Sequence, residues 1–177
     1  MNTNGTVAGL LAGFRGRGGV EDALWYHGHL MQVLADGAQT GGAFALLEMQ
    51  AVPGNEPPRH VHEREDETFY ILEGHGTFYV GDEVIEARAG DVVFMPRGVP
   101  HSFKIRSESS RVLLLITPSG FENWFREFSV PAQALTLPPA QEPPADIIEK
   151  MLAAAPRYGT TFLPPSAAEI AEGGLAK

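Results

Sequence analysis

The chain has 177 residues, 44% of them hydrophobic and 9% aromatic, which suffices for one domain with a buried core. Its 22 acidic residues outnumber the 13 Lys and Arg, and the formal net charge of −9 disfavours binding to nucleic acid through the phosphates. The absence of cysteine excludes disulfides, iron–sulfur clusters and thiolate zinc sites, which leaves His, Asp and Glu as the strong metal ligands.

Membrane association and secretion are not expected either. No stretch approaches the roughly 20 apolar residues that cross a bilayer, and no cluster of Lys and Arg favours an anionic membrane surface. The first five residues, Met1 to Gly5, place no basic residue before the short apolar patch that follows, so we expect no signal peptide. We therefore expect a cytoplasmic protein without a membrane partner.

Residues 1–22 are rich in glycine and contain Arg15 and Arg17. This composition predicts a flexible N-terminal arm, or one that becomes ordered only against a partner subunit. A glycine-rich phosphate loop is the alternative. It is disfavoured because no Gly-Lys-Ser/Thr follows the glycines and no clear strand precedes them.

Residues 23–120 are predicted to form a β-barrel domain. From Trp25 to Thr117, short apolar or alternating runs are separated by turn residues roughly every 8 to 12 positions, which is typical of an antiparallel barrel or sandwich. Gly81-Asp82 is predicted to be a hairpin turn between two of these runs. The predicted strands cover 43–51, 60–62, 68–72, 77–80, 84–88, 92–95, 101–105 and 111–117.

Residues 121–177 are predicted to form short helices and a proline-rich tail that pack on the barrel. Aromatic residues within 121–128 recur with the i, i+3, i+4, i+7 spacing of one helix face. We expect that helix to pack on the outside of the barrel, the alternative being a lid over a ligand pocket. The aromatic residues of this face are Phe121, Trp124, Phe125 and Phe128.

The rest of this C-terminal part alternates between proline-rich and helix-prone segments. Residues 131–144 carry five prolines and are expected to run extended along the surface. A second helix is predicted over 146–155, and 164–177 should form a last helical turn or fray.

Three histidines and one glutamate are spaced as metal ligands would be. On a strand, residues i and i+2 point to the same side, so His60 and His62 can present two imidazole rings to one point. The four residues after His62 suit a chain reversal that returns Glu67 to that point, and His101 arrives from a more distant strand. This donor set suits one divalent transition metal per chain, Ni, Co, Fe, Mn, Cu or Zn, without selecting among them.

The two blocks around these residues resemble the two signature motifs of the cupin superfamily. Block 54–74 reads Gly, five residues, His-x-His, four residues, Glu, six residues, Gly. Block 90–105 reads Gly, five residues, Pro-x-Gly, two residues, His, and departs from the family only at Ile105, where the second motif often has Asn. The resemblance implies an all-β fold, a single-domain jelly-roll barrel, usually a homodimer, with a metal ion inside the barrel. The ligands that it implies are His60, His62, Glu67 and His101.

Within that superfamily, the chain resembles the small single-domain cupins related to quercetin (flavonol) dioxygenases. The shared features are the run Glu-Asp-Glu-Thr-Phe-Tyr at 65–70, the turn that leads into His101, and the aromatic helix followed by a proline-rich tail. The resemblance implies an oxidoreductase that acts on a flavonol, or a related aromatic enol, together with dioxygen. Glu67 would then be both a metal ligand and the catalytic base.

Two other classes of function stay open. A non-oxidative metal enzyme (isomerase, cyclase or decarboxylase) and a small-ligand-binding module both fit the same donor set, since this fold hosts many chemistries. A DNA-binding regulator is disfavoured, because residues 1–22 are too short and too rich in glycine for a helix-turn-helix.

Three apolar residues are candidates for the substrate pocket. Phe69, Ile71 and Phe103 share the inward face of the strands that carry the ligands, so they are predicted either to border the substrate or to form the barrel core alone. His27 and His29 form a second His-x-His, but no Glu follows at the required spacing, and we expect neither to bind the metal.

Polar residues next to the motif are expected to be exposed. His75 should be solvated in the turn between Gly74 and Gly76. Glu65 and Asp66 should be exposed turn residues, the alternative being that one of them supports the ligand carboxylate from outside the coordination sphere.

Overall fold

Alternation of apolar and polar residues decides which face of each strand is buried. In β3 (Ala45–Ala51), every second residue from Ala45 onward is buried, whereas Leu46 and Glu48 face outward and are partly exposed. The burial of β10 (Ser110–Thr117) alternates in the same way. Because residues i and i+2 lie on one face of a strand, each strand contributes one apolar face to a shared interior.

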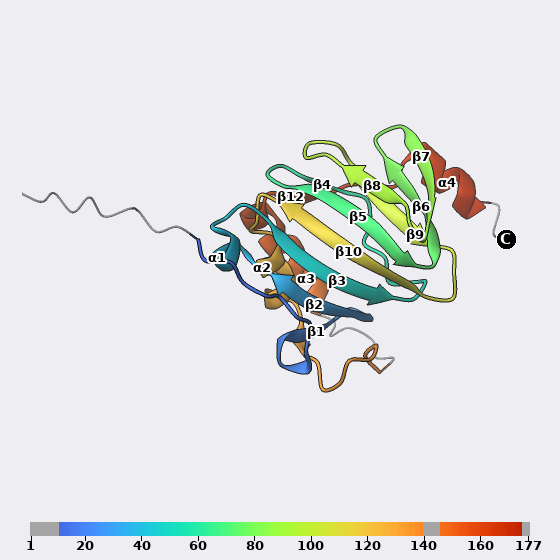
Figure 1. The fold of residues 1–177 in the computed structure, drawn as a ribbon. Helices are drawn as coiled ribbons and strands as arrows, with labels where there is room; N and C mark the ends of the chain where they lie inside the picture. Colours follow the sequence, from blue (N-terminus) through green and yellow to red (C-terminus); the bar gives the residue numbers. More distant parts are fainter. Residues whose placement is uncertain (1–10, 140–145, 175–177) are drawn as a thin grey trace, which may run out of the picture.

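The structure is a computed structural model that describes residues 11–139 and 146–174 (Figure 1). Its strands form two antiparallel sheets that face each other, one of seven strands and one of five. The larger sheet has the order β11 (Val130–Pro131), β1 (Ala23–Tyr26), β2 (His29–Ala35), β3, β10, β5 (Asp66–Glu73) and β8 (Val92–Met95). The smaller has the order β12 (Thr160–Phe162), β4 (His60–His62), β9 (His101–Ile105), β6 (His75–Val80) and β7 (Glu83–Arg88).

The helices are short and lie outside the two sheets. In Figure 1, α2 and α3 lie close to β1, β2 and β3, while α4 lies at the other side of the molecule beside β6 and β7. No helix in the described part of the chain is long and apolar enough to cross a membrane. The helical elements are η1 (Val20–Asp22), α1 (Gly37–Thr40), α2 (Glu122–Glu127), α3 (Ile147–Ala154), η2 (Ala155–Tyr158) and α4 (Ala167–Gly174).

The prediction of an all-β jelly roll with short C-terminal helices is confirmed. The predicted hairpin turn is also confirmed, because Val80 pairs with Glu83 and leaves Gly81-Asp82 as the loop. Gly81 has a φ of 61°, which suits glycine in such a turn.

Several elements were not predicted individually. The hairpin of β1 and β2 and the short strand β12 are the main ones. Of the predicted arm, residues 1–10 lie outside the described part, and residues 11–19 form no regular secondary structure. Its ordering against a partner subunit, like the division of the chain into three parts, stays a prediction.

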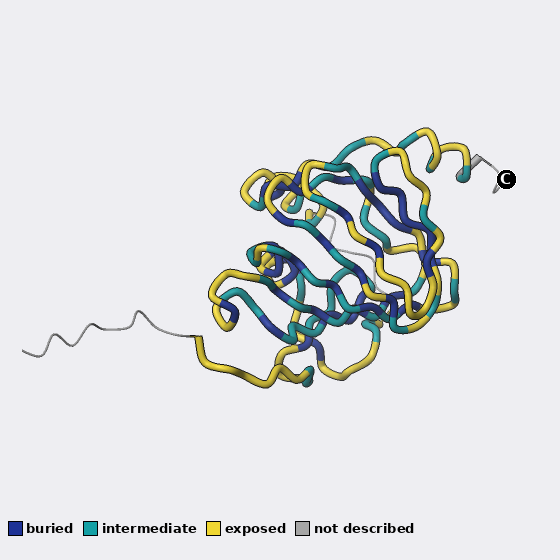
Figure 2. The backbone as a smooth tube through the Cα atoms, turned by 45° about the horizontal axis from the view of Figure 1, so that its top comes forward, coloured by how far each residue is buried: buried dark blue, intermediate teal, exposed yellow. Residues whose placement is uncertain are grey.

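Buried residues, dark blue in Figure 2, occur along strands of both sheets, and their apolar side chains form the main core cluster. Met31, Leu47 and Ile116 of the larger sheet are fully buried. Phe69 lies 5.6 Å from Phe78 and 5.5 Å from Phe103, ring centroid to ring centroid, so these aromatic side chains connect the two sheets.

Replacing Leu47 by alanine should lower the free energy of unfolding by about 2–5 kcal/mol, because it removes a fully buried side chain from a central strand. Leu46→Ala is the matched control, since Leu46 is next to it on the outward face of β3 and is only partly buried. Urea unfolding of both variants measures the difference, and equal losses would contradict the assignment of the two faces.

Candidate metal centre

The structure brings the four predicted metal ligands together. His60 and His62 come from β4, His101 from β9 and Glu67 from β5 of the other sheet. His60 and His101 are direct partners across β4 and β9, and all four residues are buried. One ligand atom from each residue lies within 4.8 Å of those of the others.

Backbone carbonyls fix the tautomers of two of the histidines. Nδ1 of His60 lies 2.9 Å from the carbonyl oxygen of Pro58, and Nδ1 of His101 lies 3.0 Å from that of Val99. A carbonyl oxygen can only accept, so each Nδ1 carries the hydrogen and donates it. In the neutral ring, Nε2 then holds a free lone pair, which is the form that binds a metal ion.

The third histidine is held by a residue from the C-terminal part. Nδ1 of His62 lies 3.1 Å from Oγ1 of Thr160, whose strand β12 pairs with β4 at His62. Sequence reasoning missed Thr160. The run Thr160-Thr161-Phe162 after Gly159 has the β propensity of a short strand, but nothing in it indicates which strand it joins.

Two atoms of this cluster are buried and have no hydrogen-bond partner within the described residues, namely Nε2 of His62 and Nε2 of His101. They lie 3.6 Å and 3.5 Å from the two carboxylate oxygens of Glu67. Buried polar atoms are rarely left unpaired, and such exceptions are often explained by an ion or a functional role. Imidazole nitrogens and a carboxylate facing one another therefore fit a divalent transition metal.

The charges in the cluster favour the metal-binding forms of its residues. Burial works against the carboxylate of Glu67, but the neighbouring His62 and His101 outweigh it and lower the pKa of Glu67 to about 2. Burial, together with the other two histidines, lowers the pKa of His60 to about 3. At neutral pH the site therefore presents an ionised carboxylate at Glu67 and a neutral imidazole at His60.

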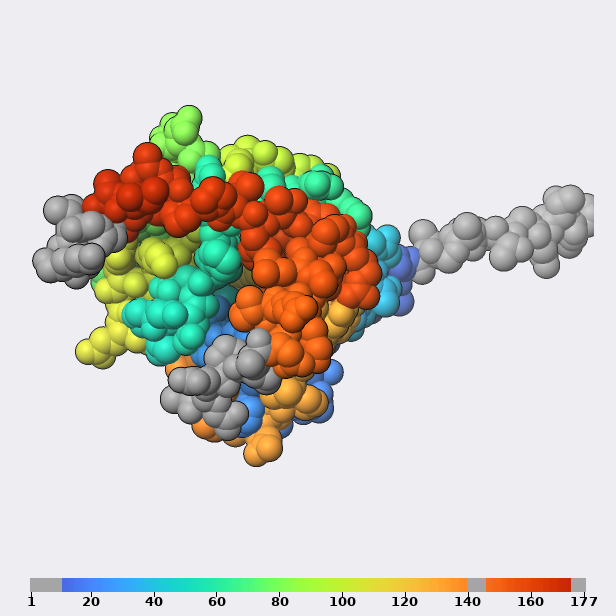
Figure 3. Space-filling view, turned by 180° about the vertical axis from the view of Figure 1, so that it is seen from behind, coloured from blue at the N-terminus to red at the C-terminus, as the bar shows by residue number. Residues whose placement is uncertain are grey.

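The cluster opens into a cavity of about 330 Å³ between the sheets and the C-terminal helices. His60, Glu67 and His101 contribute to its wall, which is otherwise mainly apolar. Figure 3 shows the side of the molecule where the C-terminal segment, coloured orange to red, lies beside the teal segment that leads into β4. The volume is at the lower end of the range typical of small-molecule sites.

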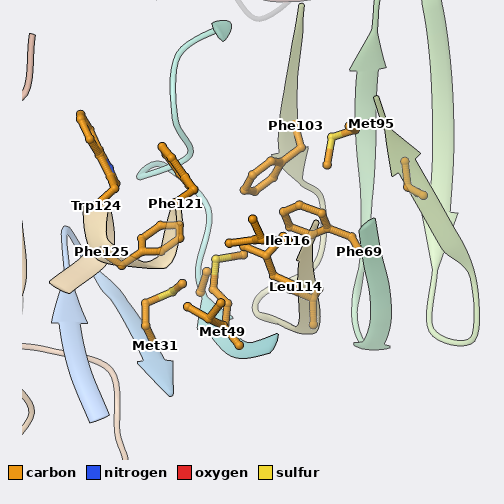
Figure 4. Close-up of a cluster of buried hydrophobic side chains, with 14 of the residues drawn as sticks. Met31, Met49, Phe69, Met95, Phe103, Leu114, Ile116, Phe121, Trp124 and Phe125 are labelled. Atoms are coloured by element: carbon orange, nitrogen blue, oxygen red, sulfur yellow. The ribbon is translucent and has the colours of Figure 1, made fainter. Parts of the chain in front are cut away.

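The aromatic face of α2 forms one wall of this cavity. Phe121, Trp124 and Phe125 line it, opposite Phe69 and Phe103 of the barrel (Figure 4). The expected helix is confirmed, but its aromatic face closes the pocket and does not merely pack on the barrel exterior. The reason is that the two sheets leave an open end there, which the aromatic side chains fill.

Two of the three predicted pocket residues face the cavity. Phe69 and Phe103 line it, so substrate contact stays a prediction for both. Ile71 does not line it, and instead borders a separate pocket of about 10 Å³. Two further residues along β5 carry Ile71 roughly 6–7 Å past Phe69, away from the metal cluster and into the barrel core.

His27 and His29 do not belong to the four-residue cluster, but both line the cavity. They stand at the hairpin of β1 and β2, where His27 has a φ of 44° and Gly28 a φ of 89°. His29 is buried, and this burial lowers its pKa to about 4. The sequence signal for these two residues was the second His-x-His. The spacing of the two histidines alone could not indicate that they line a pocket.

Glu65 differs from the expectation of an exposed turn residue. It exposes only 5% of its surface, because the turn is covered by the segment around Gly120. Burial raises the pKa of Glu65 to about 7. Asp66 is not in a turn but begins β5, where it is partly exposed and forms a two-point ion pair with Arg97. His75 is exposed, as expected, but it is the first residue of β6 and not part of a turn.

Comparisons with known proteins relate part of the sequence to a family. The family model described as "Cupin domain" matches residues 47–117. The chain is 28% identical over 120 residues to a quercetin 2,3-dioxygenase of Bacillus subtilis (strain 168). This match covers 68% of this chain and 36% of that protein. It is 36% identical over 75 residues to an oxalate-binding protein of Thermotoga maritima, which covers 42% of this chain and 62% of that protein.

The chain thus spans only part of the length of each of these two relatives. Among solved structures, a predicted oxalate decarboxylase from Thermotoga maritima is 30% identical in sequence. The superposition covers 51% of this chain and 80% of that one, with a TM-score of 0.47.

Acid should destabilise the metal-free protein, and Glu65 should oppose that effect. The folded-state pKa values of His29 and His60, about 4 and about 3, lie below the ordinary 6.5, so protons favour the unfolded chain as the pH falls below 6.5. Glu65 has a raised pKa of about 7, so its protonation favours the folded chain between pH 7 and about 4.5.

We expect Tm of the EDTA-treated protein to fall from pH 7 to pH 4.5, and to fall more steeply for Glu65→Gln, which lacks the opposing group. Thermal unfolding followed by circular dichroism at several pH values measures both profiles. A Glu65→Gln profile parallel to or shallower than that of the wild type would contradict the assignment.

Proposed function

Because the chain contains a cupin domain over residues 47–117, we propose that it is a metal-dependent dioxygenase acting on a flavonol or a related aromatic enol. The observation that carries the proposal is the position of the four-residue cluster, His60, His62, Glu67 and His101, of which all but His62 line the wall of an aromatic cavity. The similarity to a quercetin 2,3-dioxygenase over 120 residues supports it. The expected homodimer and the cytoplasmic location stay predictions.

The three histidines would hold the ion through Nε2, and Glu67 through its carboxylate. When bound, a divalent transition metal supplies Lewis-acid and redox chemistry at this position. The hydrogen bonds at Nδ1 of each ring keep the lone pairs directed into the cluster.

The cavity walls would bind and orient a flat aromatic substrate. Phe121 and Trp124 lie 5.8 Å apart with nearly parallel rings, and Phe69 and Phe103 face them. Aromatic surfaces bind other aromatic rings through stacked and edge-on contacts. The helices α2 and α3 cover this side of the cavity, so a bound substrate would be shielded from water.

Glu67 would assist the loss of the substrate's enol proton. Its carboxylate is ionised at neutral pH and is therefore in the form that accepts a proton. Burial raises the pKa of this carboxylate, and the neighbouring His62 and His101 outweigh that effect.

A small-ligand-binding role is the second candidate, because the chain is similar to an oxalate-binding protein over 75 residues. The cavity favours the first candidate. Among the described residues that line it there is no Arg or Lys, so a small dicarboxylate would have no cationic side chain to pair with. An uncharged aromatic ligand matches the lining better.

The wild-type protein should bind one divalent transition metal ion per chain. Glu67→Gln should weaken this affinity by at least about 10-fold, since even residues that only support a metal ligand typically contribute that much. Isothermal titration with Ni²⁺ or Co²⁺ measures it, and His75→Ala, on an exposed histidine of β6, is the control. Equal affinity in Glu67→Gln and the control would exclude Glu67 as a ligand.

Oxygen uptake with quercetin tests the reaction itself. The protein is reconstituted separately with Fe, Mn, Co, Ni and Cu. With at least one of these metals it should consume oxygen and the flavonol at the same time, because the cluster suits a transition metal and the cavity suits an aromatic substrate. Uptake should be lost in Glu67→Gln and kept in His75→Ala. If fully loaded protein consumes no oxygen with any metal, the dioxygenase proposal fails and the non-oxidative or binding roles replace it.

A further inference from the structure

The cavity has a second polar site that the metal cluster does not use. His29 is the first residue of β2, lines the cavity and exposes only 2% of its surface. Its Nε2 atom is buried and has no hydrogen-bond partner among residues 11–139 and 146–174. Nε2 of the neighbouring His27 is buried and unpaired in the same way.

This site is separate from the metal cluster. His29 lies on β2 and Glu67 on β5, and β3 and β10 stand between them in the sheet. Three strand spacings of about 4.8 Å therefore separate the two residues across the sheet. The cavity reaches both, because residues of the cluster and of the hairpin line the same space.

The backbone holds the His29 ring in place. His29 pairs with Tyr26 across the hairpin, and the two rings are in edge contact with centroids 6.1 Å apart. The turn is tight, since a Cβ on Gly28 would approach the side-chain amide nitrogen of Asn55 to 2.4 Å. The ring is therefore positioned before any ligand binds.

No charged neighbour satisfies the free nitrogen. Glu56 is the nearby carboxylate, but its two oxygens already accept hydrogen bonds from the backbone N–H groups of Gly54 and Ile105, both at 2.9 Å. Burial also lowers the pKa of His29 to about 4, so the ring is neutral near pH 7. A neutral imidazole has one N–H donor and one acceptor nitrogen, so an uncharged polar group that can both donate and accept is able to pair with Nε2.

We infer that His29, flanked by His27, is a hydrogen-bonding subsite for a hydroxyl group at the end of the ligand remote from the metal cluster. A hydroxyl group can donate or accept, so it pairs with Nε2 in either tautomer of the ring. The ligand is an aromatic compound with oxygen-containing groups at both ends. That the ligand is aromatic rests on the proposed function. Leaving a buried nitrogen unpaired is unfavourable, so ligands with the remote hydroxyl bind more tightly.

Equilibrium binding of two flavonols tests this inference without turnover. Quercetin carries hydroxyl groups on its outer rings, whereas 3-hydroxyflavone keeps the ring skeleton and the enol but lacks those hydroxyls. Both are titrated under anaerobic conditions into metal-loaded protein, and binding is followed by tryptophan fluorescence. The wild type should bind quercetin about 10-fold more tightly than 3-hydroxyflavone, as one added hydrogen bond predicts.

The variant His29→Phe should lose this preference by weakening quercetin binding, with 3-hydroxyflavone binding unchanged. His29→Gln keeps a polar group and should recover part of the preference, while His75→Phe is the surface control. His29→Ala gives the same comparison should the phenylalanine variant not fold.

The outcomes separate the subsite from the proposed function. A quercetin preference that persists in His29→Phe and His29→Ala would overturn the subsite and leave flavonol binding in place. If the wild type binds neither flavonol, the proposed function fails, and the inference that rests on it fails too.

Discussion

The cost of burying polar side chains constrains the centre of this molecule. Three imidazole rings and a carboxylate are enclosed between two sheets, and two ring nitrogens there lack hydrogen-bond partners among the described residues. A buried imidazole ring with one unpaired nitrogen is tolerated only when its other nitrogen forms a hydrogen bond. Backbone carbonyls of Pro58 and Val99 meet this need at Nδ1 of two rings, and Thr160 meets it at the third.

The C-terminal part of the chain completes a site whose four cluster residues all come from the barrel. β12 pairs with β4 and brings Thr160 to His62, and the aromatic face of α2 closes the open end of the sheets. α4 is tied to the smaller sheet through Glu169, which accepts a hydrogen bond from the buried Ser102 at 2.5 Å. The barrel motif alone would thus leave both the histidine orientation and the cavity wall incomplete.

The cavity combines a few polar residues with a mainly apolar wall. Glu67 on β5 and His29 on β2 both line it, and aromatic side chains form much of the rest of the wall. In a mainly apolar pocket, a small number of placed polar groups fix the orientation of a ligand and provide specificity.

The sequence determined the all-β class and the eight predicted strands, because each rests on local rules, and the resemblance of its two motifs to a known family indicated the four residues of the cluster. Strand periodicity places His60 and His62 on one face, and the turn residues fix where the neighbouring strands begin. The β1–β2 hairpin and β12 were missed as separate elements, because they are short and carry only weak local signals.

Only the tertiary structure decided which distant segments share the cavity. Thr160 and His29 carry no local signal for their roles, since these depend on the pairing of β12 with β4 and on the position of β2 in the larger sheet. Glu65 is buried, and Ile71 turns away from the cavity, for the same reason. Burial and cavity walls arise from packing between segments far apart in the chain. The spacing of residues within one strand predicts only which of them share each face of that strand.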